Sequence, residues 1–464
     1  MIRNSLLLLV FILFADANLK AQEIKDTLSW KSFIAIVKQN HPVTVKAKLV
    51  GQLAKAIKKQ AWGGFDPKFE TEFDRKIYDG TEYYSFLTPQ IKLPLWYGIE
   101  LKGSYSEAEG TFLNPESKLP KEGLSYAGIN FQLGKGLLMD NRRATFKKAV
   151  IFESASENEQ NRILNDLFFD AGENYINWKN KYANVKILEN ALNLSEVRYE
   201  AVKLGFLNGD KPAIDTLEAQ IQVQQRKVFF EQAKLELKQA QLELSTFLWL
   251  ENQIPIDAAK LNVAPDEFDL PVTPIPDLIN NPKLLSFDFK IQDLNIERRL
   301  KAESLKPELN ITLGLLNQGK TLLRNINSNY WNQNNKVNVS FAFPITFTKA
   351  RGDIAAAKIK ILDTELDKKL TENELKNKFE KNIAELNALQ NQLNILQTTL
   401  KFSEQLLKGE ETKFRFGDSS LFLINSRESK LIEVQEKLFL VEAKLKKAQL
   451  KTLWLNGSLL ENLN

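Results

Sequence analysis

The stretch FRFGDSSLFLINSRES, residues 414–429, contains the signal that decides the fold. Its Gly417-Asp418 pair separates two long segments, 351–416 and 419–456, that contain no proline and almost no glycine. Proline is rejected from helix interiors and glycine weakens them, so both segments are predicted to be helices. At 1.5 Å per residue the first would be roughly 90 to 100 Å long. The sequence therefore predicts a long antiparallel helical hairpin with its tip near Gly417.

The same arrangement occurs earlier in the chain. Gly209-Asp210 lies 208 residues before Gly417-Asp418, and the same offset separates Arg143 from Arg351. The tripeptide Leu-Trp-Leu occurs at 248–250 and again at 453–455. Segments 143–204 and 212–249 are therefore predicted to form a second hairpin with its tip near Gly209. The chain is a tandem duplication.

Two pairs of prolines, each pair 25 residues apart, precede the hairpins at a common offset of 240 residues: Pro42 with Pro67, and Pro282 with Pro307. Between the prolines, helices are predicted over 43–62 and 283–304, since proline is accepted in a first helical turn. Alternating segments follow and are predicted to be strands. They span residues 69–73, 99–105, 129–133, 309–313 and 337–343. Two strand hairpins would give about four strands. The strand region of the first half is 32 residues longer than that of the second half, so an extra pair of strands in the first half is an open alternative.

Apolar residues in the second hairpin repeat at steps of four and three. The two series are Leu389, Leu393, Leu396 and Leu400, then Val434, Leu438, Val441 and Leu445. This spacing is typical of a coiled-coil seam, so the two helices of the hairpin are expected to pack along these side chains.

The N-terminal sequence has Arg3, an apolar run from Leu6 to Phe14 and Ala21 before Gln22, which predicts a secretory signal peptide over residues 1–21. No later apolar run is long enough for a transmembrane helix. The chain has no cysteine, a single histidine (His41) and a net charge of only +5. The lack of cysteine excludes disulfides and cysteine-ligated metals. The small net charge gives no indication of nucleic-acid binding. We expect no catalytic, metal-binding or cofactor site.

Aromatic residues cluster around the predicted strand hairpins, as they do at membrane interfaces. They are Tyr78, Tyr83, Tyr84, Phe86, Trp96, Tyr97, Tyr330 and Trp331. Four strands cannot close into a membrane barrel alone, because the edges would leave backbone groups unsatisfied in lipid. Closure would need several chains. A soluble sandwich core would use the same residues, so that alternative stays open.

Taken together, the duplicated proline-flanked helix, strand hairpin and long helix, with IDTLEAQ (214–220) after the first Gly-Asp turn, resemble the TolC-like outer-membrane efflux protein family. The resemblance covers residues 22–464. It implies a mainly α fold with a β-barrel part: a homotrimer whose strands share one 12-stranded outer-membrane barrel and whose helices form a periplasmic tunnel. It divides the chain into a first repeat (22–252, strand region 68–136), a linker (253–275) and a second repeat (276–464, strand region 308–346).

The resemblance also implies a function and its sites. The protein would be the exit duct of an efflux or secretion system, coupled to a periplasmic adaptor protein and an inner-membrane transporter. Adaptor docking maps onto the helix-tip residues Gly209, Asp210, Gly417, Asp418, Ser419 and Ser420. Glu410, Glu411 and Arg415, within two turns of Gly417, are candidates for the closed periplasmic gate, although charged residues on a long helix commonly form only a solvated face.

Two other functions are open. A soluble exported coiled-coil scaffold or adaptor would carry its strands as a small β-domain. An exported hydrolase would need two facing carboxylates, but adjacent residues such as Glu410 and Glu411 diverge on a helix surface. The absence of a glycine-rich phosphate loop indicates that energy for export would come from another protein.

Overall fold

The computed structural model describes residues 27–258, 264–271, 278–321 and 329–462. The predicted signal peptide lies outside these residues, as do parts of the predicted linker. The chain divides into two compact units. The first, called the hairpin unit, comprises the described residues of Met1–Val45, Asn165–Ile275 and Phe379–Asn464. The second, called the sheet unit, comprises those of Lys46–Leu164 and Pro276–Lys378. Each unit takes segments from both halves of the duplication.

The predicted helices are confirmed, with small changes at their ends. The two shorter ones are α3 (Pro42–Trp62) and α6 (Pro282–Glu303), each beginning at a proline. The two long ones are α4 (Asn141–Leu207) and α8 (Thr348–Arg415), of 67 and 68 residues. Both long helices give their first part to the sheet unit and their last part to the hairpin unit. No helix among the described residues combines the length and hydropathy that a membrane crossing requires.

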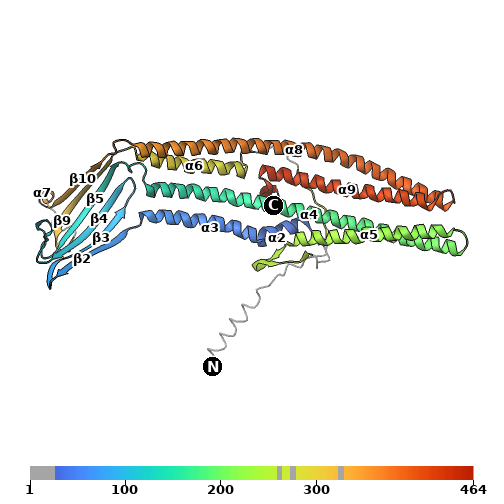
Figure 1. The fold of residues 1–464 in the computed structure, drawn as a ribbon, viewed down its shortest axis with the longest axis horizontal. Coiled ribbons are helices and arrows are strands. Elements are labelled where there is room, and N and C mark those ends of the chain that lie inside the picture. Colours follow the sequence, from blue (N-terminus) through green and yellow to red (C-terminus); the bar gives the residue numbers. More distant parts are fainter. Residues whose placement is uncertain (1–26, 259–263, 272–277, 322–328, 463–464) are drawn as a thin grey trace, which may run out of the picture. The chain divides into compact units, whose positions relative to one another are not determined.

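The sheet unit contains six strands in one antiparallel sheet, in the order β10-β9-β5-β4-β3-β2 (Figure 1). Their bounds are β2 Lys68–Tyr78, β3 Thr81–Pro94, β4 Ile99–Glu109, β5 Leu124–Gly134, β9 Glu308–Gln318 and β10 Asn335–Ala342. The expectation of about four strands was therefore wrong, and the longer first region supplies the extra pair.

Strand β3 is the element that sequence patterning missed. Pro89 lies in its middle, and a proline inside a strand normally argues against one. The structure accommodates it because the β3–β4 pairing is interrupted there: Leu87 pairs with Glu107, and pairing resumes at Gln90 with Ser104. On the other side Pro89 lies opposite Thr71 of β2. The hydrogen-bonded pairing of β3 therefore tolerates the backbone N–H that Pro89 lacks.

The two faces of the sheet differ in chemistry. On the apolar face, Leu93, Leu101, Ile129, Leu313 and Val337 lie in one row across five strands. The neighbouring row on that face is Ile99, Phe131, Ile311 and Val339. The opposite, polar face carries the row Glu100, Asn130, Thr312 and Asn338. The period of two thus gives a continuous apolar surface on one side only.

Tyr126 lies flat against two glycines on the polar face. A Cβ atom on Gly314 would lie 2.1 Å from Cε2 of Tyr126, and one on Gly128 would lie 2.1 Å from its hydroxyl oxygen. Gly128 and Gly314 are register partners on β5 and β9. Their missing side chains make room for the ring, which packs along the sheet instead of standing away from it.

Aromatic residues gather at both ends of the strands. Near the ends that join the helices, Trp96 stacks on Phe65 at 4.7 Å between ring centroids. Trp62 lies 5.0 Å from Phe146 in the same group. At the other end, Tyr83 lies 4.7 Å from Phe112, whereas Tyr330 is buried and its hydroxyl donates to the carbonyl of Leu316.

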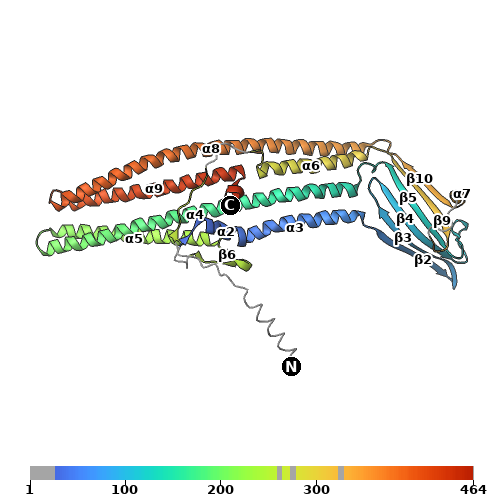
Figure 2. The same ribbon diagram turned by 180° about the vertical axis from the view of Figure 1, so that it is seen from behind.

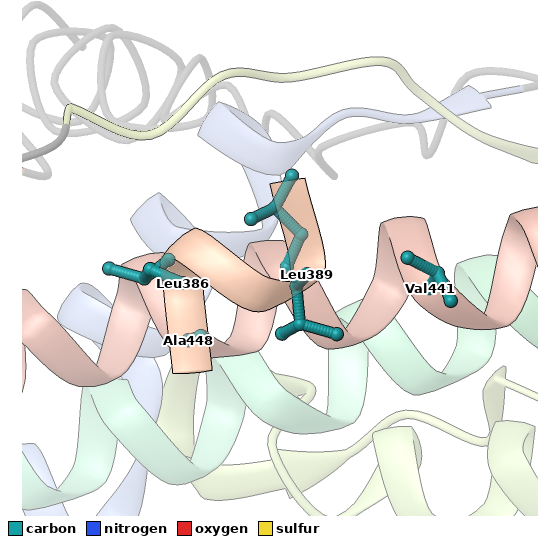
Figure 3. Close-up of a cluster of buried hydrophobic side chains, with 5 residues drawn as sticks. Leu386, Leu389, Val441 and Ala448 are labelled. Carbon is teal, nitrogen blue, oxygen red and sulfur yellow. The ribbon is translucent and has the colours of Figure 1, made fainter. Parts of the chain in front are cut away.

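The hairpin unit contains the two predicted antiparallel hairpins. The return helices are α5 (Ala213–Ser245) and α9 (Leu421–Asn456). Figures 1 and 2 show that the two hairpins lie side by side. The predicted seam is confirmed over its central part: Leu389, Leu393 and Leu396 of α8 belong to one apolar cluster with Val441 and Leu445 of α9. Figure 3 shows Leu386, Leu389, Val441 and Ala448 of this cluster.

The prediction of a helix over 212–249 was wrong at its end. Helix α5 stops at Ser245, and Trp249–Leu250 forms β6, which pairs with β7 (Ile254–Pro255). The carbonyl of Trp249 accepts from Asn40, and the ring of His41 lies 3.2 Å from the carbonyl of Thr246. These contacts fix the non-helical end, whereas the repeated tripeptide at 453–455 stays within α9.

An aromatic core supports the hairpin unit. Helix α2 (Trp30–Asn40) buries Trp30 and Phe33 against Tyr175 of α4, and Trp30 stacks on Phe268 at 4.4 Å. The Tyr175 hydroxyl donates to the carbonyl of Leu28, in β1 (Thr27–Leu28), which pairs with β8 (Ala264–Pro265). A Cβ atom on Gly172 would lie 2.6 Å from Leu450 and 3.0 Å from Trp30, so this core has no room beside the helix there.

Gly172→Val is therefore expected to destabilise the protein by about 1 to 3 kcal/mol through overpacking. Gly352→Val is a matched control, because Gly352 also lies in a long helix but a Cβ atom on it would meet no neighbouring atom within 4 Å. Thermal unfolding followed by circular dichroism at about 222 nm, the helical band, would measure both. Equal melting temperatures for the two variants would contradict the packing of Leu450 and Trp30 on Gly172.

Candidate functional site at the helical hairpin tips

Both hairpins end in the same backbone turn. Gly209 and Gly417 have φ of +85° and +83°, in the left-handed region that glycine adopts without strain. The Asp210 N–H donates to the carbonyl of Gly205, and the Asp418 N–H donates to that of Lys413. Each glycine N–H also donates to the carbonyl three residues before it, Phe206 for Gly209 and Phe414 for Gly417. Together the two hydrogen bonds form the Schellman motif, which satisfies the last carbonyls of a helix. The four predicted tip residues of the two Gly-Asp pairs therefore lie in the turns.

The two predicted serines follow the second turn and have structural contacts. The Ser419 hydroxyl donates to Oε1 of Glu410 at 2.6 Å. Ser420 is the N-cap of α9, and its hydroxyl accepts from the N–H of Leu423. The first turn has no such cap, because Pro212 occupies the equivalent position before α5. The two tips thus share a turn but differ in how the return helix begins.

The predicted gate residues are not one cluster. Glu410 is buried and bonds within its own hairpin, to Ser419 and to Arg427, whose Nε lies 3.6 Å away. The Ser419 hydrogen bond is the main cause that lowers the pKa of Glu410, so the carboxyl is ionised at neutral pH. Glu411 is half-buried, and Arg415 is exposed with its guanidinium 3.5 Å from the Thr412 hydroxyl.

A buried ion pair that the sequence reasoning missed joins the two hairpins. Nη1 of Arg198 on α4 lies 2.6 Å from Oε2 of Glu428 on α9 and 3.2 Å from Oδ1 of Asn425. The side chains of Arg198 and Glu428 are only 13% and 3% exposed. The other carboxylate oxygen of Glu428 has no hydrogen-bond partner within the described residues. Breaking such a pair leaves a buried charge uncompensated.

A second buried arginine lies beside this pair. Arg226 of α5 is 4% exposed, and its Nη2 donates to the Ser429 hydroxyl at 2.9 Å. Burial lowers the pKa of Arg226, while the nearby Glu428 opposes this effect. A sequence signal for this site exists: Glu428 lies four residues from both Ile424 and Ile432, so an acid shares a helix face with apolar side chains.

Closer to the turns, apolar packing holds the hairpins together. Val202 and Ala219 of the first hairpin bury against Leu421 of the second, with Tyr199 and Phe414 packed around them. The Lys211 ammonium lies 4.6 Å from the ring centroid of Phe414, within the range of a cation–π contact.

Large apolar side chains are exposed around the tips. Leu207 and Phe416, which precede the turns, are 69% and 79% exposed. Ile214 and Phe422, which follow the turns, are 70% and 67% exposed and line a shallow groove. Ile214 and Phe422 are also equivalent by the 208-residue offset. Exposed apolar patches of this kind mark interaction surfaces.

Along α5, an exposed apolar stripe repeats every seven residues. It comprises Ile214, Ile221, Val228, Leu235 and Leu242, which are each between 49% and 70% exposed. On α8, Ile395 and Phe402 are also seven residues apart and are 65% and 62% exposed. Heptad-spaced apolar residues are coiled-coil contact positions, so α5 presents an exposed seam and α8 an exposed pair of such positions among the described residues.

Comparison with known proteins gives agreement in structure and not in sequence. No protein-family model matches the chain, and no curated protein matches it. Among solved structures, the CmeC outer membrane channel of Campylobacter jejuni is similar at a TM-score of 0.63 and 13% identity, over 92% of this chain and 85% of that one.

Two further channels agree. The outer membrane protein VceC of Vibrio cholerae gives a TM-score of 0.65 at 14% identity, over 91% of this chain and 95% of that one. The MtrE outer membrane channel of Neisseria gonorrhoeae gives a TM-score of 0.65 at 12% identity, over 92% of this chain and 88% of that one. The mainly helical fold with duplicated hairpins is thus confirmed, and this chain has the fold of the TolC-like outer-membrane channels. The shared trimeric barrel stays a prediction.

Proposed function

We propose that the protein is a homotrimeric outer-membrane channel that serves as the exit duct of an efflux or secretion system. Its sheet would lie in the outer membrane and its helices in the periplasm, where the hairpin tips would meet an adaptor protein coupled to an inner-membrane transporter. The observation that carries this proposal is the two-faced sheet, whose two edge strands have no outer partner among the described residues. The soluble scaffold is not favoured, because a soluble β-domain would have to cover the apolar face.

The sheet supports a membrane location. Its apolar face includes Phe69, Phe73, Val339 and Phe341, which are all at least 59% exposed. Its strands are mostly of 11 residues, close to the 9 to 11 that cross a bilayer when tilted. Aromatic groups at both strand ends match the girdles of membrane barrels. The free edges of β2 and β10 require partners, since lipid supplies no hydrogen bonds.

The exposed stripes support a tunnel built from several copies. Pairing α5 of one chain with α8 of the next would bury both unpartnered seams, and the same contact repeated three times would close a ring. Such a ring needs no catalytic group. The solved neighbours are channels, which agrees with a protein that is not an enzyme.

We further propose that the Arg198–Glu428 pair holds the α8–α9 hairpin against the α4–α5 hairpin and so keeps the tunnel mouth narrow. Glu410, Glu411 and Arg415 remain gate candidates at the mouth itself. In a trimer, three copies of a lumen-facing carboxylate such as Glu411 would form an acidic ring that favours cations. Glu410 would act by holding the second turn through Ser419 and Arg427.

The first prediction concerns assembly. Protein extracted from membranes in detergent is expected to contain three chains by native mass spectrometry and to conduct ions in a planar bilayer. Membrane fractionation should place it with the outer membrane. A monomer that remains soluble in buffer without detergent would remove the proposal.

The second prediction concerns the buried ion pair. Arg198→Ala is expected to lower stability by about 3 to 5 kcal/mol and to raise the basal bilayer conductance, because Glu428 loses its partner. Lys430→Ala is the control: Lys430 pairs with Glu433 on the exposed surface of α9, and such pairs contribute about 0 to 1 kcal/mol. Unchanged conductance in Arg198→Ala, with a trimer still assembled, would show that the pair does not restrain the mouth.

The third prediction concerns adaptor docking. Phe416→Glu removes an exposed apolar contact without straining the turn, and Asp418→Arg reverses a charge beside it. Together they are expected to abolish export while trimers still form. Gly417→Leu, which forces a side chain into a φ of +83°, should distort the turn itself and have the same effect.

The matched control for Phe416→Glu is Ile279→Glu, because Ile279 is 85% exposed and lies outside both hairpins. It should export normally. Export would be followed as resistance to, or secretion of, the cargo in cells that lack the native gene. Loss of trimers in the tip variant would instead assign these residues a structural role.

A further inference from the structure

The two outer strands of the sheet have no strand partner on one side within the described residues. The sheet has six strands, and β2 and β10 are its edges. All neighbouring pairs in the sheet are antiparallel, so these two edges run in opposite directions. An edge strand presents a row of unpaired backbone groups that invites another strand. A β2 strand can therefore pair with β10 of a second copy in the antiparallel sense that the rest of the sheet uses.

We propose that three copies close one barrel of 18 strands, in which β2 of each chain pairs with β10 of the next. This proposal rests on the trimer proposed above and replaces the 12-stranded barrel that the family resemblance implied. The occupant of each free edge is thus a second copy of the same chain.

The chemistry of the two edges is continuous across such a junction. On the apolar side β2 carries Phe69 and Phe73, and β10 carries Val339 and Phe341. On the polar side, β2 carries the acidic residues Glu70, Glu72 and Asp74, and β10 carries Lys336, Asn338 and Ser340. Neither β2 nor β10 contains a proline, the residue that commonly blocks an edge. Pairing with apolar sides matched extends both faces without interruption.

The stagger of the sheet is that of a barrel wall. A row of register partners that begins at Lys68, the first residue of β2, passes through Lys92, Lys102, Gly128 and Gly314. It reaches β10 at Lys336, six residues before the last residue of that strand, Ala342. At ~3.3 Å per residue and ~4.8 Å between strands, this corresponds to a tilt of about 40°, within the usual range of about 35 to 45° for barrels. The stagger accumulates between β2 and β5, because Gly134, Glu308 and Ala342, at the helix-side ends of β5, β9 and β10, are register partners. Strands β2 and β3 therefore contribute to the average tilt, as strands of a barrel wall would.

The width of six strands also fits the helices of the same unit. The sheet unit takes four helical segments from each chain, from α3, α4, α6 and α8. Side by side at ~8 to 10 Å, four helices occupy about 32 to 40 Å of circumference. Six strands at a tilt of about 40° occupy about 38 Å, whereas four would occupy about 25 Å. A barrel of 18 strands would thus match the helical ring that adjoins it, with a backbone diameter of about 36 Å.

A lumen of this size would be open. Small barrels fill their interior with side chains, whereas barrels of about 16 to 18 strands leave an aqueous channel. The polar face would line it, with Tyr126 folded onto Gly128 and Gly314 instead of reaching inwards.

The chain lacks cysteine, so disulfide trapping can test the junction directly. Val339→Cys on β10 would be combined in separate variants with Phe69→Cys, Thr71→Cys or Phe73→Cys on β2. In one chain these strands lie at opposite edges of the sheet, beyond the Cα separation of about 4 to 7 Å that a disulfide allows. Any bond must therefore join two copies. At least one pair is expected to give a covalent trimer on a non-reducing gel that collapses to monomer on reduction.

The control combines Val339→Cys with Leu101→Cys on β4, the strand that would be the edge if only four strands per chain entered a 12-stranded barrel. Cross-linking in this control, or a detergent trimer in which no β2 position cross-links, would overturn the 18-stranded barrel and leave the proposed duct intact. A native mass of two chains would also overturn it. A failure to form any oligomer would remove the duct itself, so the two failures are distinguishable.

Discussion

Unpaired backbone groups on β2 and β10 are the constraint on which the structure depends. The period of two gives the sheet one apolar face, which favours lipid, but lipid offers no partner for an exposed N–H or C=O group. A single chain cannot satisfy both demands. The same incompleteness recurs in the helices, where the heptad stripe on α5 and its counterpart on α8 have no partner in one copy. In the proposed trimer, copies arranged around one axis would meet both requirements, through the β2–β10 contact in the sheet and the α5–α8 contact in the helices.

Much of the fold could be predicted from proline and glycine. Pro42 and Pro282 mark the starts of α3 and α6, and the glycines of the Gly-Asp pairs end α4 and α8. The seam between α8 and α9 followed from its spacing. Strand β3 did not, because Pro89 argues against a central strand, and the tolerance for it depends on a local gap in the β3–β4 ladder that only tertiary pairing reveals.

The sequence duplication predicted where equivalent residues lie along the two halves, but it did not predict the structural surroundings of those residues. Trp249 and Trp454 occupy matching tripeptides, yet the first ends in β6 and the second lies in α9, where its indole donates to Asp166. Arg143 and Arg351 also match, but Arg143 is buried and donates to the carbonyls of Gly136 and Leu137, while Arg351 is exposed. The tip turns were predictable from glycine, whereas the Arg198–Glu428 pair depends on two helices that meet only in the folded chain.

The unequal capping of the two turns has a consequence for anything that binds there. Ser420 and the Glu410–Ser419 bond tie the second turn to both of its helices, whereas Pro212 leaves the first turn without a side-chain cap. A threefold rim built from such chains would present six turns of two alternating kinds, one followed by a side-chain cap and one not. A ligand with sixfold pseudo-symmetry would then meet two chemically distinct binding sites at the rim. Three ligand subunits per trimer would fit this arrangement as well as six.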